Sequence, residues 1–321
     1  MIEKIIEATK NGTLLWKIKR KIYETERKRQ KILFVKNRDV KSVAYQCKDY
    51  AKLYRQYKAQ IQEGVSTTAE RVHSDKVWVC WLQGYEKAPA LVKACINSIH
   101  GVMPEKDIVI LTNENYKEYV DFPEYIEEKF QKGQIGMAHF SDLLRISLLA
   151  QWGGMWIDAT ALCTDREFFE YVSKQPLFVF KQLNLSNQDD PPIIASNWYI
   201  SCETNNPIIL LTRNLLYSYW KDHDFAENYF IFHLFFAMAC RRYKEEWNSV
   251  PTFNNNSPHV LMFELSSDYT NERWTQLMKM SGIHKLQRYE DYSNLKNSNY
   301  CHILNKYLNI DLSLLVLCLS S

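Results

Sequence analysis

The chain has 321 residues, of which 46% are hydrophobic and 24% are charged. A chain of this size can bury a full core, and it suits one large α/β domain with an appendage better than two equal domains. No stretch reaches the roughly 20 apolar residues that a membrane-spanning helix needs. The best candidate, LSLLVLCL near the C-terminus, is too short, and we expect it to pack as a terminal element.

Eight cysteines are scattered along the chain and form no CxxC or CxxH pair. Several lie in apolar runs such as VWVCWL and AMAC, which favours buried free thiols in a reducing compartment over a disulfide framework or a zinc site. The N-terminal segment reads as helical and charged and lacks the apolar core of a signal peptide. We therefore expect a cytoplasmic protein.

The net charge of +3 is distributed unevenly. Between Lys17 and Lys58 there are 15 Lys and Arg residues against four Asp and Glu, a net +11 that leaves −8 for the rest. Each basic side chain near an anionic leaflet contributes about 1 kcal/mol of attraction, so this segment can hold the protein on the inner face of the cytoplasmic membrane. Nucleic acid would attract it as well, and a solvated helical face is the third interpretation. We expect membrane contact and no nucleic acid.

At Lys76 the chain changes character. Residues 1–72 contain no proline, and helical spacing predicts amphipathic helices, followed by a linker at GVSTTAERVHSD. The residues that show this spacing are Tyr50, Leu53, Tyr54, Tyr57 and Ile61. The sequence therefore predicts a basic helical extension over 1–72 and an α/β domain over 73–321.

Beyond Lys76 the pattern is that of an α/β sheet. KVWVCWLQG and KDIVILTNEN are apolar runs that end in glycine or polar residues, which predicts two buried strands. Between them, APALVKACINSIHG predicts a helix with Pro89 in its first turn and Gly101 beyond its end. Uniformly apolar strands joined by a helix predict a parallel sheet.

FSDLLRISLLAQWGG predicts a further helix with Ser141 as its N-cap. The glycines at 153 and 154 end this helix, and MWID is the next strand. Beyond Thr164, we predict a strand at PLFVFKQ, helices at NPIILLTRNLLYSYW and NYFIFHLFFAMACRRY, and loops at DDPPII and FNNNSPHV.

The candidate site lies where the SDLLR helix leads into the strand that ends at Asp158. Asp142 and Arg145 are three residues apart, so they share a helix face and can pair. Ligands of parallel α/β sheets bind beyond the carboxyl ends of the strands, where Asp158 stands. A carboxylate there can hold a hard divalent cation together with phosphate oxygens and water. A surface ion pair and a strand-end capping aspartate are the structural alternatives.

The segment AHFSDLLRISLLAQWGGMWIDAT resembles the signature of glycosyltransferases that use a DxD motif on a GT-A fold. It is most similar to the bacterial capsular polysaccharide synthesis branch, related to glycosyltransferase family 32, and more distantly to the catalytic domains of large clostridial glucosylating toxins. The resemblance extends loosely from Lys76 to Leu286 and leaves the N-terminal helices outside. It implies a GT-A fold, with a Rossmann-like, mostly parallel sheet flanked by helices.

By position, the resemblance implies that Asp158 is the first aspartate of DxD, reaching the metal and the nucleotide sugar. Asp142 and Arg145 match positions that contact the donor sugar and diphosphate, so these three are the predicted catalytic residues. The segment ASNWYISCETNNP offers candidates for lining the donor or acceptor cleft: Ser196, Asn197 and Trp198. The structural alternative is that these residues belong to a loop and strand of the second layer.

Trp81 matches a tryptophan that stacks on the donor base in the toxin-like relatives, and a strand-end indole suits that role. We place Gln83 and Gly84 of the same turn in the nucleotide site with it. Core packing is the alternative for Trp81.

This chain departs from DxD at Thr160, which offers a hydroxyl where the second aspartate stands. Capsular-type relatives often carry DAT here, but a metal bond from Thr160 would be weaker than one from a carboxylate. The resemblance implies that a late histidine completes the metal shell and that a neighbouring lysine neutralises the diphosphate, roles that His284 and Lys285 fit. A structural histidine is the alternative for His284. Three scattered histidines are interpreted as structural: His223, His233 and His259.

The predicted function is metal-dependent hexose transfer, with retention implied by the resemblance, from a UDP-sugar or GDP-sugar to a growing glycan or lipid-linked glycan, with Mn²⁺ or Mg²⁺ as cofactor. No residue stands out as a base or nucleophile. One alternative is a nucleotidyltransferase or phosphotransferase, although WLQGYEKAPA contains neither GxGxxG nor GxxxxGK[ST]. The other is a basic nucleic-acid-binding protein, which would not explain the SDLLR and GGMWID block.

Overall fold

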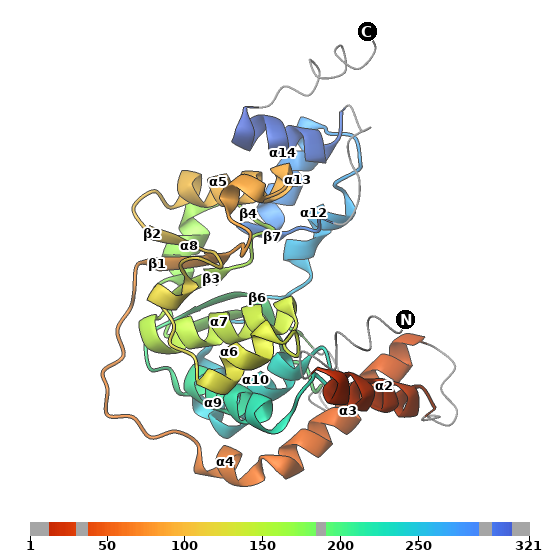
Figure 1. Ribbon diagram of the computed structural model, residues 1–321. Coiled ribbons are helices and arrows are strands. Elements are labelled where there is room, and N and C mark those ends of the chain that lie inside the picture. Colours follow the sequence, from red (N-terminus) through yellow and green to blue (C-terminus); the bar gives the residue numbers. More distant parts are fainter. Residues whose placement is uncertain (1–12, 30–37, 184–190, 289–296, 310–321) are drawn as a thin grey trace.

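A five-stranded sheet in the order β2–β1–β3–β6–β5 lies at the centre of the computed structural model (Figure 1). The structure describes residues 13–29, 38–183, 191–288 and 297–309. β1 pairs in parallel with β2 and with β3, whereas β6 pairs antiparallel with β3 and with β5. The strands are β1 (Lys76–Cys80), β2 (Asp107–Leu111), β3 (Gly154–Ile157), β5 (Leu177–Lys181) and β6 (Ala195–Cys202).

Among these described strands, β6 alone runs in the reverse direction. The predicted α/β fold with a mostly parallel sheet flanked by helices is therefore confirmed. The strands expected at KVWVC, DIVIL, MWI and LFVFK are all present. Their runs are apolar because both faces of the sheet are covered.

The helices that connect the parallel strands are α5 (Ala90–Val102), α6 (Glu124–Gln131) and α7 (Met137–Trp152). Two predicted boundaries are wrong. Gly101 lies inside α5, and Ser141 is not an N-cap, because α7 begins at Met137. Phe140 of the first turn of α7 is fully buried and stacks on Phe130 with 3.6 Å between ring centroids. This packing extends the helix by one turn beyond the predicted start.

Gly153 and Gly154 form the turn from α7 into β3, with φ values of 62° and 86°. A Cβ atom on Gly154 would lie 2.2 Å from the carbonyl oxygen of Lys76, and one on Gly153 would lie 2.8 Å from the backbone nitrogen of Thr204. Both the left-handed backbone and the close approach of neighbouring chain therefore require glycine. This turn fixes where β3, and with it Asp158, leaves the sheet.

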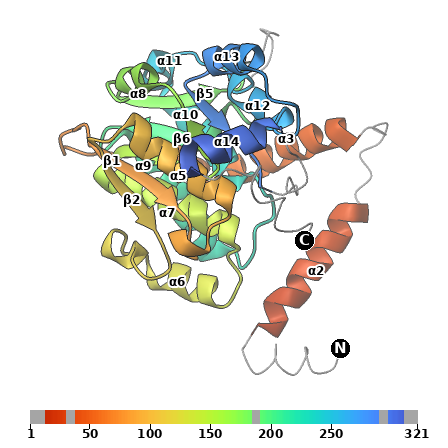
Figure 2. The same ribbon diagram turned by 90° about the horizontal axis from the view of Figure 1, so that it is seen from above.

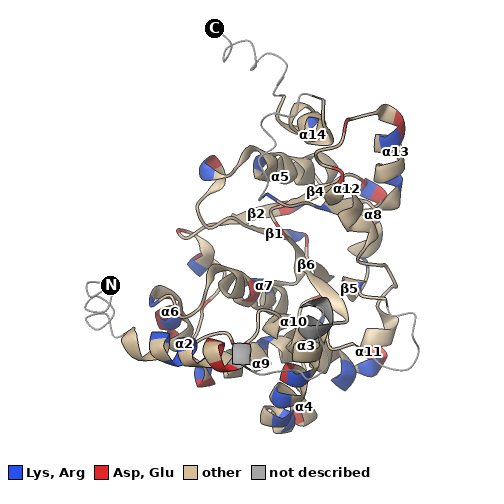
Figure 3. Cartoon of the chain, turned by 90° about the vertical axis from the view of Figure 1, so that its right-hand side faces the viewer, with Lys and Arg blue, Asp and Glu red and all other residues tan. Residues whose placement is uncertain are grey.

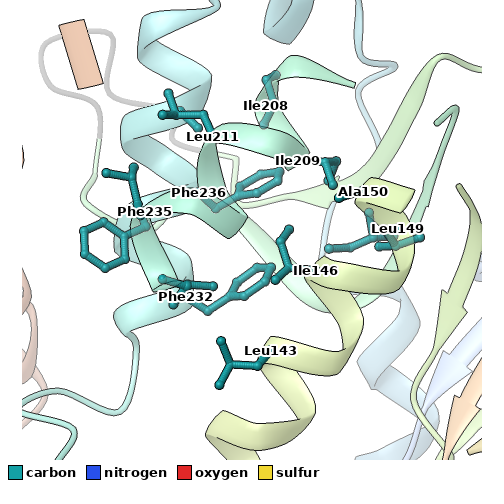
Figure 4. Close-up of a cluster of buried hydrophobic side chains, with 14 of the residues drawn as sticks. Leu143, Ile146, Leu149, Ala150, Ile208, Ile209, Leu211, Phe232, Phe235 and Phe236 are labelled. Atoms are coloured by element: carbon teal, nitrogen blue, oxygen red, sulfur yellow. The ribbon is translucent and has the colours of Figure 1, made fainter. Parts of the chain in front are cut away.

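One face of the sheet is covered by α7, α9 (Pro207–Asp222) and α10 (Ile231–Arg242), and the other by α5 and the C-terminal helices (Figure 1). The helices α9 and α10 occur where the sequence predicts them. Figure 4 shows side chains of α7, α9 and α10 meeting in the main core, among them Ile146, Ile209 and Phe232. This core holds α7 firmly against the sheet.

The chain before β1 is helical, as predicted: α2 (Leu14–Arg29), α3 (Arg38–Gln56) and α4 (Lys58–Glu63). Lys and Arg are spread along these helices (Figure 3). Leu53, Tyr57 and Ile61 belong to the same core cluster as α7, α9 and α10. Residues 64–75 form no helix or strand, as expected of the linker. The division into an extension over 1–72 and a domain over 73–321 stays a prediction.

A small antiparallel sheet of β4 (Ala161–Cys163) and β7 (Ile283–Lys285) lies beside the end of β3. FNNNSPHV contains a short 3-10 helix, η3 (Ser257–His259). The remaining helices are α8 (Arg166–Val172), α11 (Lys244–Ser249), α12 (Val260–Phe263), α13 (Asn271–Met280) and α14 (Asn299–Leu308), with the 3-10 turns η1 (Tyr85–Lys87) and η2 (Tyr116–Glu118).

Of the cysteines that the structure describes, most are buried free thiols, as expected: Cys95, Cys163, Cys202, Cys240 and Cys301. LSLLVLCL, including Cys318, and the beginning of DDPPII lie outside the described residues. Within the described ranges, no helix combines the length and the apolar content that crossing a membrane requires.

Candidate active site at the strand ends

Asp158 follows β3 at the carboxyl ends of the parallel strands. β1 pairs with β3 at Val77–Met155 and Trp78–Trp156. Burial raises the pKa of the Cys80 thiol at the end of β1, and Asp158 is close enough for its charge to act in the same direction. The backbone N–H of Asp158 donates to the Trp198 carbonyl oxygen of β6 at 2.9 Å, which fixes the turn after β3. The Asp158 side chain is 25% exposed. It therefore stands at the edge of the sheet where ligands of such sheets bind.

Two cations and an indole surround the Asp158 carboxylate. The Lys285 ammonium donates to Oδ2 at 2.8 Å, while Arg145 Nη2 and Trp156 Nε1 donate to Oδ1 at 3.1 Å and 2.9 Å. Burial by itself would raise the pKa of Asp158, but the charges of Lys285 and Arg145 and their hydrogen bonds outweigh it and hold the pKa below its usual value. The carboxylate is ionised at neutral pH.

Asp142 and Arg145 of α7 form the predicted i, i+3 ion pair, in which Arg145 Nη1 donates to Asp142 Oδ1. Their side chains are only 10% and 5% exposed, so this is a buried pair, not a surface pair. Asn197 Nδ2 of β6 donates to Asp142 Oδ1 at 2.8 Å, and the Arg145 guanidinium lies 4.7 Å from the centroid of the Trp156 ring. Arg145 thus connects both carboxylates in a fixed geometry.

Thr160 and Asp158 converge on a single cationic atom. Lys285 Nζ donates to Thr160 Oγ1 at 2.6 Å and to Asp158 Oδ2 at 2.8 Å. The antiparallel pairing of Ala161 with Lys285 brings the lysine to this position from 125 residues away in sequence. The two oxygens are thereby shown to point at one shared position that accommodates positive charge.

This donor set fits a divalent cation of the Mg²⁺ or Mn²⁺ type. Such ions are commonly held by one or two protein oxygens and take their remaining ligands from substrate phosphates and water. Asp158 Oδ2 and Thr160 Oγ1 would supply those oxygens if the Lys285 ammonium moved aside. In the described part of the chain, no group of three or more His, Cys, Asp or Glu side chains is arranged to hold a metal ion. Substrate oxygens would have to complete the coordination.

His284 is not brought to this position. Successive side chains of a strand point to opposite faces, and His284 pairs with Leu162 while Lys285 pairs with Ala161. The ring of His284 is 1% exposed, and burial lowers its pKa to about 4. The predicted role of His284 as a metal ligand would need a rearrangement of β7, and it stays a prediction.

The turn that contains Trp81, Gln83 and Gly84 lies at the carboxyl ends of β1 and β2, one strand away from Asp158. The Gly84 N–H donates to the Trp81 carbonyl oxygen at 2.8 Å, and Gly84 has a φ of 85°. Gln83 is exposed. The Trp81 ring packs partly on the core, and the Arg288 guanidinium lies 4.8 Å from its centroid. The Trp81 ring therefore already makes a cation–π contact.

Two histidines, His233 and His139, lie near the cluster. The sequence predicts a structural role for His233, and His139 is not among the predicted site residues. His233 of α10 is close enough to the cluster for Asp142, Arg145 and Asp158 to influence its pKa, which burial lowers to about 4. His139 Nδ1 lies 3.8 Å from Asp142 Oδ2. The i, i+3 spacing of His139 and Asp142 in AHFSD indicates that these two side chains share a helix face. The segment FIFHLFF around His233 is uniformly apolar and does not indicate which residues the ring contacts.

A third histidine, His259, lies near the lysine end of the cluster. It lies within FNNNSPHV, at the end of η3, and its Nδ1 makes a 2.6 Å hydrogen bond with the Asn255 carbonyl oxygen. Burial lowers the pKa of His259, and the charge of Lys285 acts in the same direction. The Trp198 ring meets the His259 ring edge-on at 5.7 Å. Only the packing of η3 against β7 brings this residue close.

The fold is that of an α/β protein in which an aspartate paired with a lysine and an arginine stands at the strand ends, the edge of the sheet where ligands of such folds bind. A family model described as "Capsular polysaccharide synthesis protein" matches residues 28–304. The chain belongs to this family, which confirms the identification suggested by the resemblance. The match begins before α3, so the prediction that the N-terminal helices lie outside the resemblance is wrong for α3 and α4.

Two further proteins are similar to this chain. The "O-glycosyltransferase braB" of Annulohypoxylon truncatum is 28% identical over 184 residues, which cover 52% of this chain and 42% of that protein. The chain thus matches less than half the length of this relative. The name of this relative agrees with the predicted transferase class. Among solved structures, "PaToxG Glycosyltransferase" is 15% identical with a TM-score of 0.37, covering 84% of this chain and 98% of that one.

Proposed function

We propose that this protein is a glycosyltransferase that moves a hexose from a nucleoside diphosphate sugar to a hydroxyl group of a growing bacterial surface glycan. The observation that carries the proposal is the convergence of Asp158 Oδ2 and Thr160 Oγ1 on one cation position, next to Arg145 at the strand ends. Membership of the capsular polysaccharide synthesis family supports it.

In this proposal, Asp158 and Thr160 would hold Mn²⁺ or Mg²⁺ beside the donor diphosphate. The ion supplies positive charge that stabilises the leaving diphosphate. Lys285 Nζ releases the two oxygens and pairs with a phosphate oxygen, an exchange of one charge-assisted hydrogen bond for another. Because the Lys285 Nζ atom occupies the cation position at the end of a flexible side chain, a short movement of that side chain is enough to vacate it.

Arg145 and Asp142 position the donor. Arg145 is held by two carboxylates and by the Trp156 ring, so its guanidinium has little freedom and acts as a fixed positive charge. Asp142 accepts from Asn197 and keeps acceptor capacity for a sugar hydroxyl. Both Asp142 and Asp158 are ion-paired, which does not favour either as a covalent nucleophile. Retention would then proceed with the leaving phosphate oxygen taking the acceptor proton.

Three finer assignments belong to the same proposal. The Trp81 ring stacks on the base of a UDP-sugar or GDP-sugar, with Arg288 moving from the ring towards phosphate. Gln83 and Gly84 line the nucleotide site, where the open space around Gly84 leaves room for a ligand. The acceptor is a glycan or lipid-linked glycan on the inner face of the cytoplasmic membrane.

A donor screen tests the proposal. The protein is incubated with Mn²⁺ and a panel of UDP-sugars and GDP-sugars, and release of the nucleoside diphosphate is measured with and without EDTA. We expect one donor to be turned over and EDTA to abolish the turnover. Absence of release with every donor, or release that EDTA leaves unchanged, would refute metal-dependent transfer.

The matched variants are Asp158→Asn and Asp107→Asn. Asp158→Asn removes the charge without changing the shape and should lower turnover at least about 100-fold. Asp107 lies at the opposite end of the strands and its side chain is 59% exposed, so Asp107→Asn should leave turnover unchanged. Thermal unfolding of both variants separates lost chemistry from lost folding. A fully active Asp158→Asn enzyme would contradict the assignment.

A further inference from the structure

Helix α2 leaves an apolar face uncovered. Leu15, Ile18 and Ile22 are 74%, 47% and 53% exposed. Their spacing places them on one side of the helix. A shallow depression of about 310 Å³ is lined by Ile18, Lys21, Ile22 and two neighbours on the same helix, Thr25 and Glu26. Single exposed apolar residues are common, but a run of them along one helix face points to an interaction surface.

The other side of α2 holds the helix to the body. The Tyr23 hydroxyl donates to the Glu227 carbonyl oxygen at 3.2 Å, and the Tyr23 ring lies 5.4 Å from the Phe225 ring. Trp16, seven residues earlier and therefore on the same side as Tyr23, is buried. Figure 2 shows α2 projecting beside the body of the protein. The Leu15, Ile18 and Ile22 face is thus directed away from the contacts that anchor the helix.

Basic side chains flank this face. Helix α2 carries seven Lys and Arg residues against two Glu, and its first turn contains no acidic residue. Lys17, Lys19 and Lys21 alternate with the apolar residues and are all exposed. A short apolar stripe bordered by lysines, on a helix that is otherwise rich in charged residues, is the pattern of a helix that lies in the plane of a membrane interface.

We propose that the face formed by Leu15, Ile18 and Ile22 inserts into the interface of an anionic lipid bilayer, with the flanking lysines paired with lipid phosphates. A second copy of the chain suits this surface less well. Three side chains are far from the roughly 800 Å² per partner of a stable protein interface. A symmetric pairing of α2 helices would also bring the lysines of both copies together, whereas anionic headgroups neutralise them.

Membrane contact through α2 would bring the strand-end site close to the bilayer surface. Tyr23 contacts the loop that contains Phe225 and Tyr229, and the 66% exposed Tyr229 ring lies 5.9 Å from the His139 ring. His139 in turn lies 3.8 Å from the Asp142 carboxylate. Given the proposed transferase activity, this placement favours an acceptor attached to a membrane lipid. The lipid binding itself does not depend on that activity.

Vesicle flotation of the full-length protein without donor tests the proposal. We expect flotation with vesicles of phosphatidylcholine and phosphatidylglycerol, weaker flotation at high salt, and little with phosphatidylcholine alone. The double variant Ile18→Glu, Ile22→Glu places two acids in the apolar face and should lower the partition coefficient at least about tenfold. Phe263→Glu changes an apolar residue on α12 that is even more exposed, at 77%, and this variant should bind vesicles like the unaltered protein.

A charge variant separates the two contributions. Lys17→Gln, Lys19→Gln and Lys21→Gln together should weaken binding to anionic vesicles by about tenfold or more and remove most of the salt dependence. Flotation of the Ile18→Glu, Ile22→Glu variant at the level of the unaltered protein would overturn the proposal. The proposal would also be overturned if the unaltered protein formed a dimer and did not bind vesicles, and if the Ile18→Glu, Ile22→Glu variant were monomeric. Activity on a soluble acceptor should be unchanged in all α2 variants, so its loss would concern the transferase proposal alone.

Discussion

The strand-end cluster and helix α2 both carry basic side chains beside apolar atoms, but these charges are buried and paired in the cluster and exposed on α2. The cluster consists of Asp142, Arg145, Asp158 and Lys285. At the strand ends, Arg145 and Lys285 are 5% and 19% exposed, and each is bound to a carboxylate. On α2, the paired side chains of Arg20 and Glu24 are 52% and 51% exposed. Charges removed from water need a partner because their desolvation is costly, whereas water screens the charges on α2.

The two regions therefore differ in how their charges are balanced in the absence of a ligand. The cluster satisfies its own charges and is held in one geometry by the fold, so a substrate must displace an existing ion pair. The α2 surface has little internal compensation, and its apolar and basic groups gain a favourable environment only from a partner. Substitutions should therefore affect stability in the cluster and binding on α2.

The largest expected effect is at the turn that holds the cluster. Gly154→Ala should destabilise the protein by more than about 3 kcal/mol, because its Cβ would lie 2.2 Å from the Lys76 carbonyl oxygen and its φ is 86°. Gly84→Ala is the control, since Gly84 has nearly the same φ but nothing within 4 Å of a Cβ; about 1–3 kcal/mol is expected from backbone strain alone. Urea unfolding measures both, and equal losses would contradict the role of the Lys76 contact.

The two ion pairs give the most direct comparison. Arg145→Met leaves Asp142 and Asp158 without their shared cation and should cost about 3 kcal/mol of unfolding free energy. Arg20→Met breaks a pair that is half exposed and should cost less than about 0.5 kcal/mol. Denaturant unfolding at neutral pH checks both values. Similar losses of unfolding free energy in the two variants would show that burial does not make the ion pairs of the cluster more important for stability.

The pH dependence of stability should report the buried histidines near the cluster. Burial lowers the pKa of His233 and of His284 to about 4, so between about pH 6.5 and 4 the unfolded chain binds protons that the folded chain does not. Stability should therefore fall as pH decreases through this window, by up to about 1.4 kcal/mol per pH unit for each histidine. His284→Leu should reduce the slope of stability against pH by the contribution of one histidine. An unchanged slope would contradict the burial of a neutral ring.

The smallest expected effect concerns competition at the cation position. Lys285→Met removes the ammonium that now binds Asp158 and Thr160, so Mn²⁺ should bind about tenfold more tightly in the absence of donor. Lys279→Met on the exposed side of α13 is the control and should leave Mn²⁺ affinity unchanged. Electron paramagnetic resonance of free Mn²⁺ measures both. Weaker Mn²⁺ binding in Lys285→Met would place the ion elsewhere.

Much of the fold was predictable because its signals are local. The apolar runs that became β1, β2 and β3, and the paired glycines after α7, show their structure within a few residues. The i, i+3 spacing also anticipated the Asp142 and Arg145 pair. The start of α7 was placed too late, because what extends the helix is the stacking of Phe140 on Phe130, a contact between two helices that no local pattern contains.

The lysine and histidine of SGIHKL show where local information ends. Both were assigned to the site, and the structure brings only Lys285 there. Which of two neighbouring strand residues faces Asp158 depends on the register of β7 against β4, more than 100 residues away. A shift of that register by one residue would exchange the two side chains.

The sequence by itself determined the elements that depend on neighbours along the chain: the parallel strands, the strand-end position of Asp158, and the basic character of the N-terminal helices. The tertiary structure decided which of the predicted distant residues reach the cluster, Lys285 and Asn197 but not His284. It alone brought His233 close and left one face of α2 uncovered. Secondary structure follows short-range sterics and hydrophobic periodicity. The environment of a charge depends on packing between segments that are far apart in sequence.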